Sequence, residues 1–126
     1  MRVLVCGSRT LTDARPIQVL LEGCLHEAWA LNERLIVIEG GCPSGADFYA
    51  ADWADACDLA HVQFRADWDK HGRAAGPIRN QRMLTEGQPD VVWAFVDKPL
   101  AESRGTANMV GLARAQGVPT YVVETS

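Results

Sequence analysis

The sequence predicts an α/β fold in which a mostly parallel sheet of about five strands lies between two layers of helices. Two observations lead to this prediction. Short apolar runs alternate with longer segments of helical periodicity along all 126 residues. Glycine-rich turns follow the first two apolar runs, where each strand would turn into a helix. No linker, repeat or low-complexity stretch breaks the alternation, so we expect one domain over residues 1–126.

The expected strands are short runs rich in Val, Ile and Leu. Runs of this kind are typical of parallel strands that are buried on both faces of a sheet. The strands are expected at residues 2–6, 35–38, 60–64, 91–96 and 118–123. Because helical segments separate them, each strand can lie parallel to its neighbour.

The expected helices have apolar residues at helical spacing and recognisable ends. They cover residues 14–31, 45–57, 77–86 and 105–116, with loops at 66–76 and 98–103. Thr12 or Asp13 is expected to cap the first helix, and Ser44 the second. Pro77 fits the first turn of the third helix, because its missing N–H costs nothing there.

In a parallel α/β sheet, ligands bind outside the carboxyl ends of the strands. Four segments with polar or glycine-rich sequence are expected at that edge, namely residues 7–9, 39–47, 66–80 and 97–106. Their convergence follows from the topology. We therefore expect a single site built from all four.

The first segment is Gly7-Ser8-Arg9. Gly7 allows a tight turn, Ser8 offers a hydroxyl group, and Arg9 offers a bidentate donor for phosphate. A plain turn followed by a surface arginine is the structural alternative. We interpret all three residues as ligand contacts because of their position at the end of the first strand.

The second glycine-rich turn is the strongest local signal, with the sequence Gly40-Gly41-Cys42-Pro43-Ser44-Gly45-Ala46-Asp47. It combines close backbone approach with the start of a helix, where free N–H groups attract anions. It has neither the G-K-[ST] of a Walker loop nor the G-x-G-x-x-G of a dinucleotide loop. We expect Gly40, Gly41, Ser44 and Gly45 to contact a ligand.

Two carboxylates flank this turn. An acid at the end of a buried strand is costly unless it is bonded or solvated, which favours a site role for Glu39. Asp47 either complements the helix dipole or serves the site, by binding a ribose hydroxyl or by acting as a base. We take both residues as ligand-binding residues and as candidate catalytic residues.

The last two segments supply an aromatic ring, a cation and a second helix start. Trp68 either stacks on a base or anchors its loop. Arg79 and Asn80 fall in the first turn of the expected third helix, where an arginine opposes the helix dipole unless an anion binds there. Gly105 and Thr106 either cap the last helix or bind a phosphate or ribose group.

Composition and charge argue against several classes of function. The net charge of −4 argues against a general nucleic-acid binder, which carries a basic excess. The sequence shows no signal peptide and no apolar run near the roughly 20 residues of a membrane helix, so we expect a cytoplasmic protein without membrane contact. The four cysteines have no paired spacing, so we expect no metal site and no cofactor.

The four motifs together resemble a known family. G-S-R after the first strand, G-G-x-x-x-G-A-D after the second, A-D-W before A-G-P-x-R-N, and G-T opening a late helix are similar to the YspA/YpsA-related branch of the SLOG superfamily. The resemblance spans nearly the whole chain. It implies a Rossmann-like fold and a nucleotide-derived ligand. The wider superfamily includes LOG phosphoribohydrolases, DNA-processing DprA proteins, and sensors proposed to bind nucleotide or ADP-ribose signals.

The resemblance extends only partly to catalysis. LOG enzymes use an arginine early in a helix, which Arg79 matches, and a glutamate in a P-G-G-x-G-T-x-x-E motif. Here Glu102-Ser103-Arg104 leads up to Gly105-Thr106, and Met109 stands where that motif has its glutamate. A thioether cannot support a glycosyl cation or activate water as a carboxylate can. Glu39, Asp47 and Asp67 are the carboxylates that could take its place.

The sequence thus leads to three hypotheses. The first is binding of a nucleoside phosphate or an ADP-ribose-like ligand, by a sensor or a sequestering protein. The second is a LOG-like nucleoside-monophosphate N-glycosidase, and the third is DprA-like DNA binding, which the acidic balance opposes. The chain has large apolar side chains that a small domain does not always bury, namely Trp29, Trp53 and Trp93. A homo-oligomer is compatible with this apolar surface.

Overall fold

The fold of the protein is described here from a computed structural model that covers residues 1–125. Its centre is a sheet of five parallel strands in the order β3-β2-β1-β4-β5. The strands are β1 (Arg2–Gly7), β2 (Ile36–Glu39), β3 (Ala60–Gln63), β4 (Val91–Val96) and β5 (Thr120–Glu124). The predicted α/β fold with a parallel five-stranded sheet is therefore confirmed.

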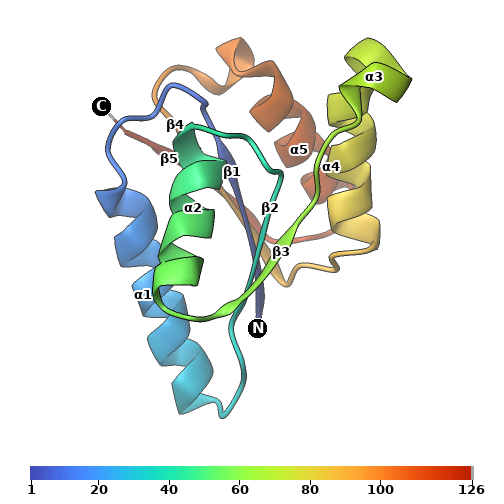
Figure 1. Ribbon diagram of the computed structural model, residues 1–126. Coiled ribbons are helices and arrows are strands. Elements are labelled where there is room, and N and C mark those ends of the chain that lie inside the picture. Colours follow the sequence, from blue (N-terminus) through green and yellow to red (C-terminus); the bar gives the residue numbers. More distant parts are fainter. Residues whose placement is uncertain (126) are drawn as a thin grey trace.

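Helices cover both faces of the sheet, as Figure 1 shows. α1 (Arg15–Ala30) and α2 (Gly45–Ala56) pack on one face, and α4 (Ala75–Thr85) and α5 (Arg104–Ala115) pack on the other. Three short elements complete the chain: the helix α3 (Trp68–His71) and the 3-10 turns η1 (Gly72–Ala74) and η2 (Leu100–Glu102). None of the helices in the described part of the chain is long and apolar enough to cross a membrane.

Alternation along β1 divides the core between the two faces. Val3 and Val5 point toward α1 and α2, whereas Leu4 and Cys6 point toward α4 and α5. All four residues are buried, as expected for a strand at the centre of a parallel sheet. Burial on both faces fixes the register of β1 against its neighbours β2 and β4.

The strand order creates a switch point between β1 and β4. The chain moves outward from β1 through β2 to β3 with α1 and α2 on one face, and then returns to the other side of β1. The loops after β1 and β4 therefore leave the sheet in opposite directions. The gap between such loops is where open α/β sheets bind ligands.

The segment after β3 differs from the expected loop at residues 66–76. The Asp67 side chain accepts a hydrogen bond from the Lys70 amide at 3.1 Å, which caps the short helix α3. α4 then begins at Ala75, two residues before Pro77. Pro77 still lies in the first turn, but Arg79 lies in the second, so the argument that Arg79 opposes the dipole in the first turn was wrong.

Two expected caps also differ in detail. Ser44 is the N-cap residue of α2, but its hydroxyl donates to the Arg9 carbonyl oxygen at 3.0 Å instead of capping an amide. Ala14 is the N-cap residue of α1, and Asp13 accepts from the Arg15 amide at 3.0 Å. Ser44 thus binds the loop after β1 in place of an amide of α2, whereas Asp13 satisfies the first amide of α1 from the position before the N-cap residue.

Candidate functional site

A cavity of about 580 Å³ lies at the carboxyl edge of the sheet, over the switch point between β1 and β4. Segments that follow β1, β2, β3 and β4 all contribute to its walls. Eleven of the fourteen expected ligand-binding residues line it: Gly7, Ser8, Arg9, Gly40, Gly41, Asp47, Trp68, Arg79, Asn80, Gly105 and Thr106. The structure thus brings the four sequence segments together at one edge.

Glu39, Ser44 and Gly45 do not line the cavity. Glu39 is fully buried at the end of β2, beneath the turn. Ser44 is exposed on the outside of the turn. Gly45 packs against the loop after β1, where a Cβ atom would lie 2.1 Å from the Ser8 carbonyl oxygen. With a φ of +72°, Gly45 also has a conformation that other residues rarely adopt.

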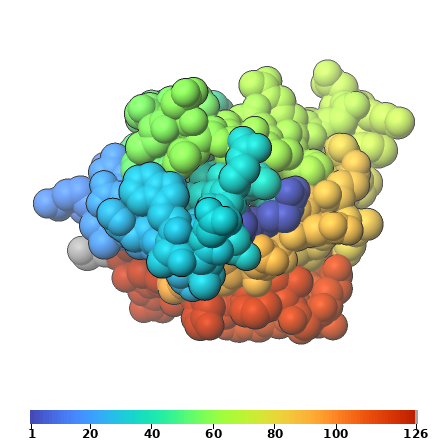
Figure 2. All heavy atoms as spheres, turned by 90° about the horizontal axis from the view of Figure 1, so that it is seen from below, coloured from blue at the N-terminus to red at the C-terminus, as the bar shows by residue number. Residues whose placement is uncertain are grey.

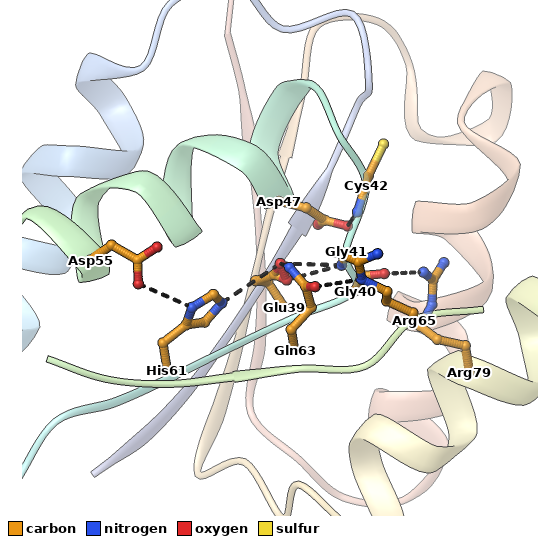
Figure 3. A network of polar contacts seen from close by, with 10 residues as sticks. All are labelled: Glu39, Gly40, Gly41, Cys42, Asp47, Asp55, His61, Gln63, Arg65 and Arg79. Carbon is orange, nitrogen blue, oxygen red and sulfur yellow. Dashed lines mark hydrogen bonds and ion pairs between the residues drawn. The ribbon is translucent and has the colours of Figure 1, made fainter. Parts of the chain in front are cut away.

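The buried Glu39 carboxylate holds the glycine-rich turn in place (Figure 3). It accepts hydrogen bonds from the Gly41 amide at 2.9 Å and from Gln63 Nε2 at 2.7 Å. On its other side, Nε2 of His61 lies 3.7 Å from Oε1 of Glu39, and Nδ1 of His61 lies 3.5 Å from Asp55. The hydrogen bonds satisfy a buried carboxylate that would otherwise be costly.

Asp47 binds the same turn from the first turn of α2. The Cys42 amide donates to Oδ2 of Asp47 at 3.2 Å. The Asp47 side chain is almost fully buried but reaches the wall of the cavity. Burial and the neighbouring Glu39 carboxylate together raise the pKa of the Asp47 carboxyl from 3.8 to about 6, against the opposing effects of the Cys42 amide, Arg79 and Arg9.

The two carboxylates change the interpretation of the turn. From the sequence we expected the amides of residues 40–45 to face an anion. Instead, the Gly41 amide is bound by Glu39 and the Cys42 amide by Asp47. The turn is therefore held by the protein's own carboxylates, and cationic side chains around it are the groups left to attract an anion.

Arg79 and Asn80 connect three walls of the cavity. Nη1 of Arg79 donates to the Gly40 carbonyl oxygen at 2.6 Å, and Nε of Arg79 donates to Oδ1 of Asn80 at 2.9 Å. Nδ2 of Asn80 in turn donates to the Gly105 carbonyl oxygen at 3.2 Å. Nη2 of Arg79 makes no hydrogen bond to residues 1–125, so this face of a firmly held guanidinium is free for a ligand.

The N-terminus of α5 forms the wall opposite the glycine-rich turn. Arg104, Gly105 and Thr106 are its first residues, and the first amides of a helix have no partner within the helix. Thr106 is 6% exposed, and its hydroxyl has no hydrogen-bond partner in the described part of the chain. The wall therefore offers amides and a hydroxyl, together with the positive end of the helix dipole.

Ser8 joins the loops after β1 and β4. Its hydroxyl oxygen accepts from the Asp97 amide at 3.2 Å and lies 3.4 Å from the Ser103 hydroxyl oxygen. Gly7 makes this contact possible, because a Cβ atom at that position would overlap the Phe95 carbonyl oxygen at 2.0 Å. Ser8 and Gly7 therefore fix the rim of the cavity as well as lining it.

Trp68 lies at the outer side of the cavity, at the start of α3. Half of its surface is exposed, and its ring approaches Gly76 at the beginning of α4. An exposed indole at the mouth of a cavity can stack on a planar ligand group. This position is compatible with both alternatives that the sequence left open for Trp68.

Positive charge gathers at the cavity although the chain is acidic. Five of the twelve Lys and Arg residues line the cavity, whereas two of the sixteen Asp and Glu residues do so. The cations are Arg9, Arg65, Arg79, Lys98 and Arg104, and the carboxylates are Asp47 and Glu102. Charges of one sign in a concave site focus their field on an incoming ligand of the opposite sign.

Arg65, Lys98 and Arg104 were not identified from the sequence. Arg65 follows β3 and Lys98 follows β4, so the rule that located Arg9 would also have found them, and Arg104 begins α5 within the expected segment 97–106. Cys6, Met83 and Met109 form an apolar part of the lining and gave no comparable signal. Burial raises the pKa of the Cys6 thiol, and the Asp47 carboxylate adds to this effect.

The opposite end of the molecule offers a useful contrast (Figure 2). There the loop from α1 to β2 lies beside the loop from α2 to β3. A smaller hollow of about 300 Å³ lies between residues of these segments, among them Trp29, Leu35 and Leu59, with Arg34 as its cation. The cluster of cations is thus a feature of the carboxyl edge.

Comparisons with known proteins agree with the resemblance seen in the motifs. A family model for the YspA, cpYpsA-related SLOG family matches residues 1–71. The Gene 61 protein of Mycobacterium phage D29 is 36% identical over 123 residues, which cover 94% of this chain and 92% of the phage protein. No solved structure gives a significant match. The chain belongs to the YspA/cpYpsA-related SLOG family.

Proposed function

We propose that this protein binds a nucleotide-derived anion, a nucleoside phosphate or an ADP-ribose-like molecule, in the cavity at the carboxyl edge of the sheet. The observation that carries the proposal is the gathering of five cations in one cavity of a chain whose net charge is −4. A ligand with several negative charges complements such a lining. Membership in the SLOG family supports a nucleotide-related ligand.

The geometry favours phosphate at two walls. Arg79 presents a fixed guanidinium beside Gly40, and Arg9 lies at the end of β1. At the opposite wall, the first amides of α5 and the Thr106 hydroxyl lie beside Arg104. A volume of about 580 Å³ falls in the range of cavities that bind small organic ligands. Trp68 at the mouth would stack on the base.

Binding without turnover would suit a sensor or a protein that sequesters a signalling nucleotide. The cavity lacks the glutamate of the LOG motif, because Met109 lines the position where that side chain would act. Similarity to a phage protein is compatible with a sequestering role. The DNA-binding alternative receives no support, because the cations are gathered in a cavity and the chain as a whole is acidic.

The proposal predicts that ADP-ribose and AMP bind and that adenosine binds far more weakly. Arg79→Gln should weaken the binding of both ADP-ribose and AMP by about tenfold or more, because a charge-assisted contact is worth roughly 1.5–3 kcal/mol. Isothermal titration calorimetry measures this directly. Arg82→Gln is the matched control, since Arg82 lies on the same helix, outside the cavity, and pairs with Glu86 at 2.7 Å. Equal affinity for adenosine and AMP would contradict the proposal.

One observation favours a second function, hydrolysis of a nucleoside monophosphate. Asp47 lines the cavity, and burial raises its pKa to about 6, which suits a general acid or base near neutral pH. A LOG-like N-glycosidase would release free base from AMP, and Asp47→Asn would abolish the release. Chromatography of AMP incubated with the protein tests this. If AMP binds but remains intact, hydrolysis is contradicted and binding is the function that remains.

A further inference from the structure

We propose that ligand binding in the cavity is coupled to the uptake of a proton by Asp47, so that the site holds its anion more tightly as the pH falls. The inference rests on the proposed function, because it requires an anion beside Arg79 and Arg9. It adds a means of regulation to that site. Asp47 becomes the group that links affinity to pH.

Asp47 lies close to Arg79, with Gly40 next to both side chains. Gly40 lies between them: a Cβ atom at Gly40 would be 2.8 Å from Nη1 of Arg79 and 3.1 Å from Oδ2 of Asp47. Figure 3 shows both side chains directed toward the glycine-rich turn, from opposite sides. Both residues also line the cavity, so an anion bound to the free Nη2 of Arg79 would share this cavity with the Asp47 carboxylate.

Charged groups on several elements surround Asp47. Glu39 at the end of β2 opposes its ionisation, whereas Arg79 on α4 and Arg9 after β1 favour it. The Asp47 carboxylate also helps to raise the pKa of the Cys6 thiol on β1. On β3, His61 faces the far side of Glu39 at 3.7 Å. The effect of burial exceeds that of the two arginines, and the pKa of Asp47 is about 6. A modest additional negative potential would therefore raise this pKa above about 7.

An anionic ligand supplies that additional potential. It competes with the Asp47 carboxylate for the two arginines, and repulsion between like charges is strong in a partly buried site. Proton uptake removes the repulsion. The protonated carboxyl also gains an O–H group that can donate to the anion while Oδ2 still accepts from the Cys42 amide.

The opposite role for Asp47 makes an opposite prediction. If the ionised carboxylate accepted a hydrogen bond from a ribose hydroxyl, ligand affinity would rise with pH. Asp47→Asn would then weaken binding. Under the coupling proposed here, affinity falls as pH rises above about 6, and Asp47→Asn binds at least as tightly as the wild-type protein at neutral pH.

The experiment is calorimetric titration of the full chain with ADP-ribose, whose two phosphate charges do not change near neutral pH. Measurement at one pH in buffers of different ionisation enthalpy gives the number of protons taken up. We expect on the order of one proton per bound ligand near pH 7, and affinity that falls about tenfold from about pH 6 to about pH 8. Asp47→Asn should abolish both effects.

Two variants serve as controls. Glu102→Gln removes the other carboxylate of the lining and should leave proton uptake unchanged. His61→Gln removes the imidazole on the far side of Glu39 and should also leave it unchanged. ADP-ribose binding without proton uptake, or uptake that persists in Asp47→Asn, would overturn this inference and leave the proposed function standing. Absence of ADP-ribose binding would overturn this inference, and absence of AMP binding as well would overturn the proposed function.

Discussion

At the scale of single residues, the structure separates two carboxylates that look alike in the sequence. Glu39 lies beneath the glycine-rich turn and is fully buried, with hydrogen bonds from Gly41 and Gln63. Asp47 lies on the cavity wall and has one such bond, from Cys42. The first carboxylate therefore shapes the turn, whereas the second remains available to a ligand. Proximity in sequence to one glycine-rich turn could not distinguish them, because the difference lies in β3, which supplies Gln63.

Asp47 leads to a prediction about stability. Its pKa is higher in the folded chain, about 6 instead of 3.8, so its ionisation destabilises the fold. The cost is absent below about pH 4 and fully present above about pH 6, where it reaches about 3 kcal/mol at 1.36 kcal/mol per pH unit. Asp47→Asn should therefore raise the free energy of unfolding at neutral pH, by up to that amount, and leave it nearly unchanged near pH 4.

Urea denaturation at both pH values measures the effect. Asp52→Asn is the matched control, because Asp52 lies on the same helix and is exposed. We expect the control to change the free energy of unfolding by less than about 0.5 kcal/mol. A neutral-pH stability of Asp47→Asn below that of the wild-type protein would mean that the ionised carboxylate stabilises the turn.

At the scale of elements, the sequence predicted the strands well because they are buried on both faces. Continuous apolar runs such as Val91–Val96 have no other place in a chain of this size. The segment at residues 66–76 was predicted less well. Its structure depends on a local cap, Asp67 to Lys70, and on small residues that continue into α4. Apolar periodicity carries no information about either feature.

The junction between β2 and α2 gives a second prediction. Gly45 has a φ of +72°, and a Cβ atom there would lie 2.1 Å from the Ser8 carbonyl oxygen. Gly45→Ala should destabilise the fold by about 2 kcal/mol or more, because both the conformation and the contact oppose a side chain. Thermal unfolding followed by circular dichroism would show a lower midpoint.

Gly111 in α5 is the control for this prediction. Gly111 lies on an exposed face of α5, away from both helix ends, and nothing lies within 4 Å of a Cβ atom at this position. Gly111→Ala should therefore stabilise the fold, by about 1 kcal/mol, through helix propensity alone. If both variants changed the unfolding midpoint in the same direction, the geometry assigned to the Gly45 turn would be incorrect.

At the scale of the whole molecule, topology accounts for the site. No single motif predicted the sheet order β3-β2-β1-β4-β5, but this order places the carboxyl ends of β1, β2, β3 and β4 at one edge. The residues that were predicted, such as Arg9 and Arg79, meet there for this reason. The bonding of the turn amides to Glu39 and Asp47 could not be predicted, because it depends on how the turn folds back on the sheet.

The apolar surface bears on assembly. Trp53 is buried in the core and cannot serve an interface, whereas Trp29 is 62% exposed. Trp93 of β4 stacks on the exposed Tyr121 of the edge strand β5, with ring centroids 4.6 Å apart. Formation of a homo-oligomer through these surfaces stays a prediction. It is independent of the cavity, whose lining comes from the carboxyl edge.

The proposed anionic nucleotide binds between the glycine-rich turn and the start of α5. Titration of the isotopically labelled protein with ADP-ribose, followed by amide nuclear magnetic resonance, shows which residues the ligand contacts. We predict the largest shifts at Gly105 and Thr106 and at the Trp68 indole, with little change at Leu35 and Leu59 at the opposite end. Shifts centred on Leu35 and Leu59, or no shifts with either ADP-ribose or AMP, would contradict the claim.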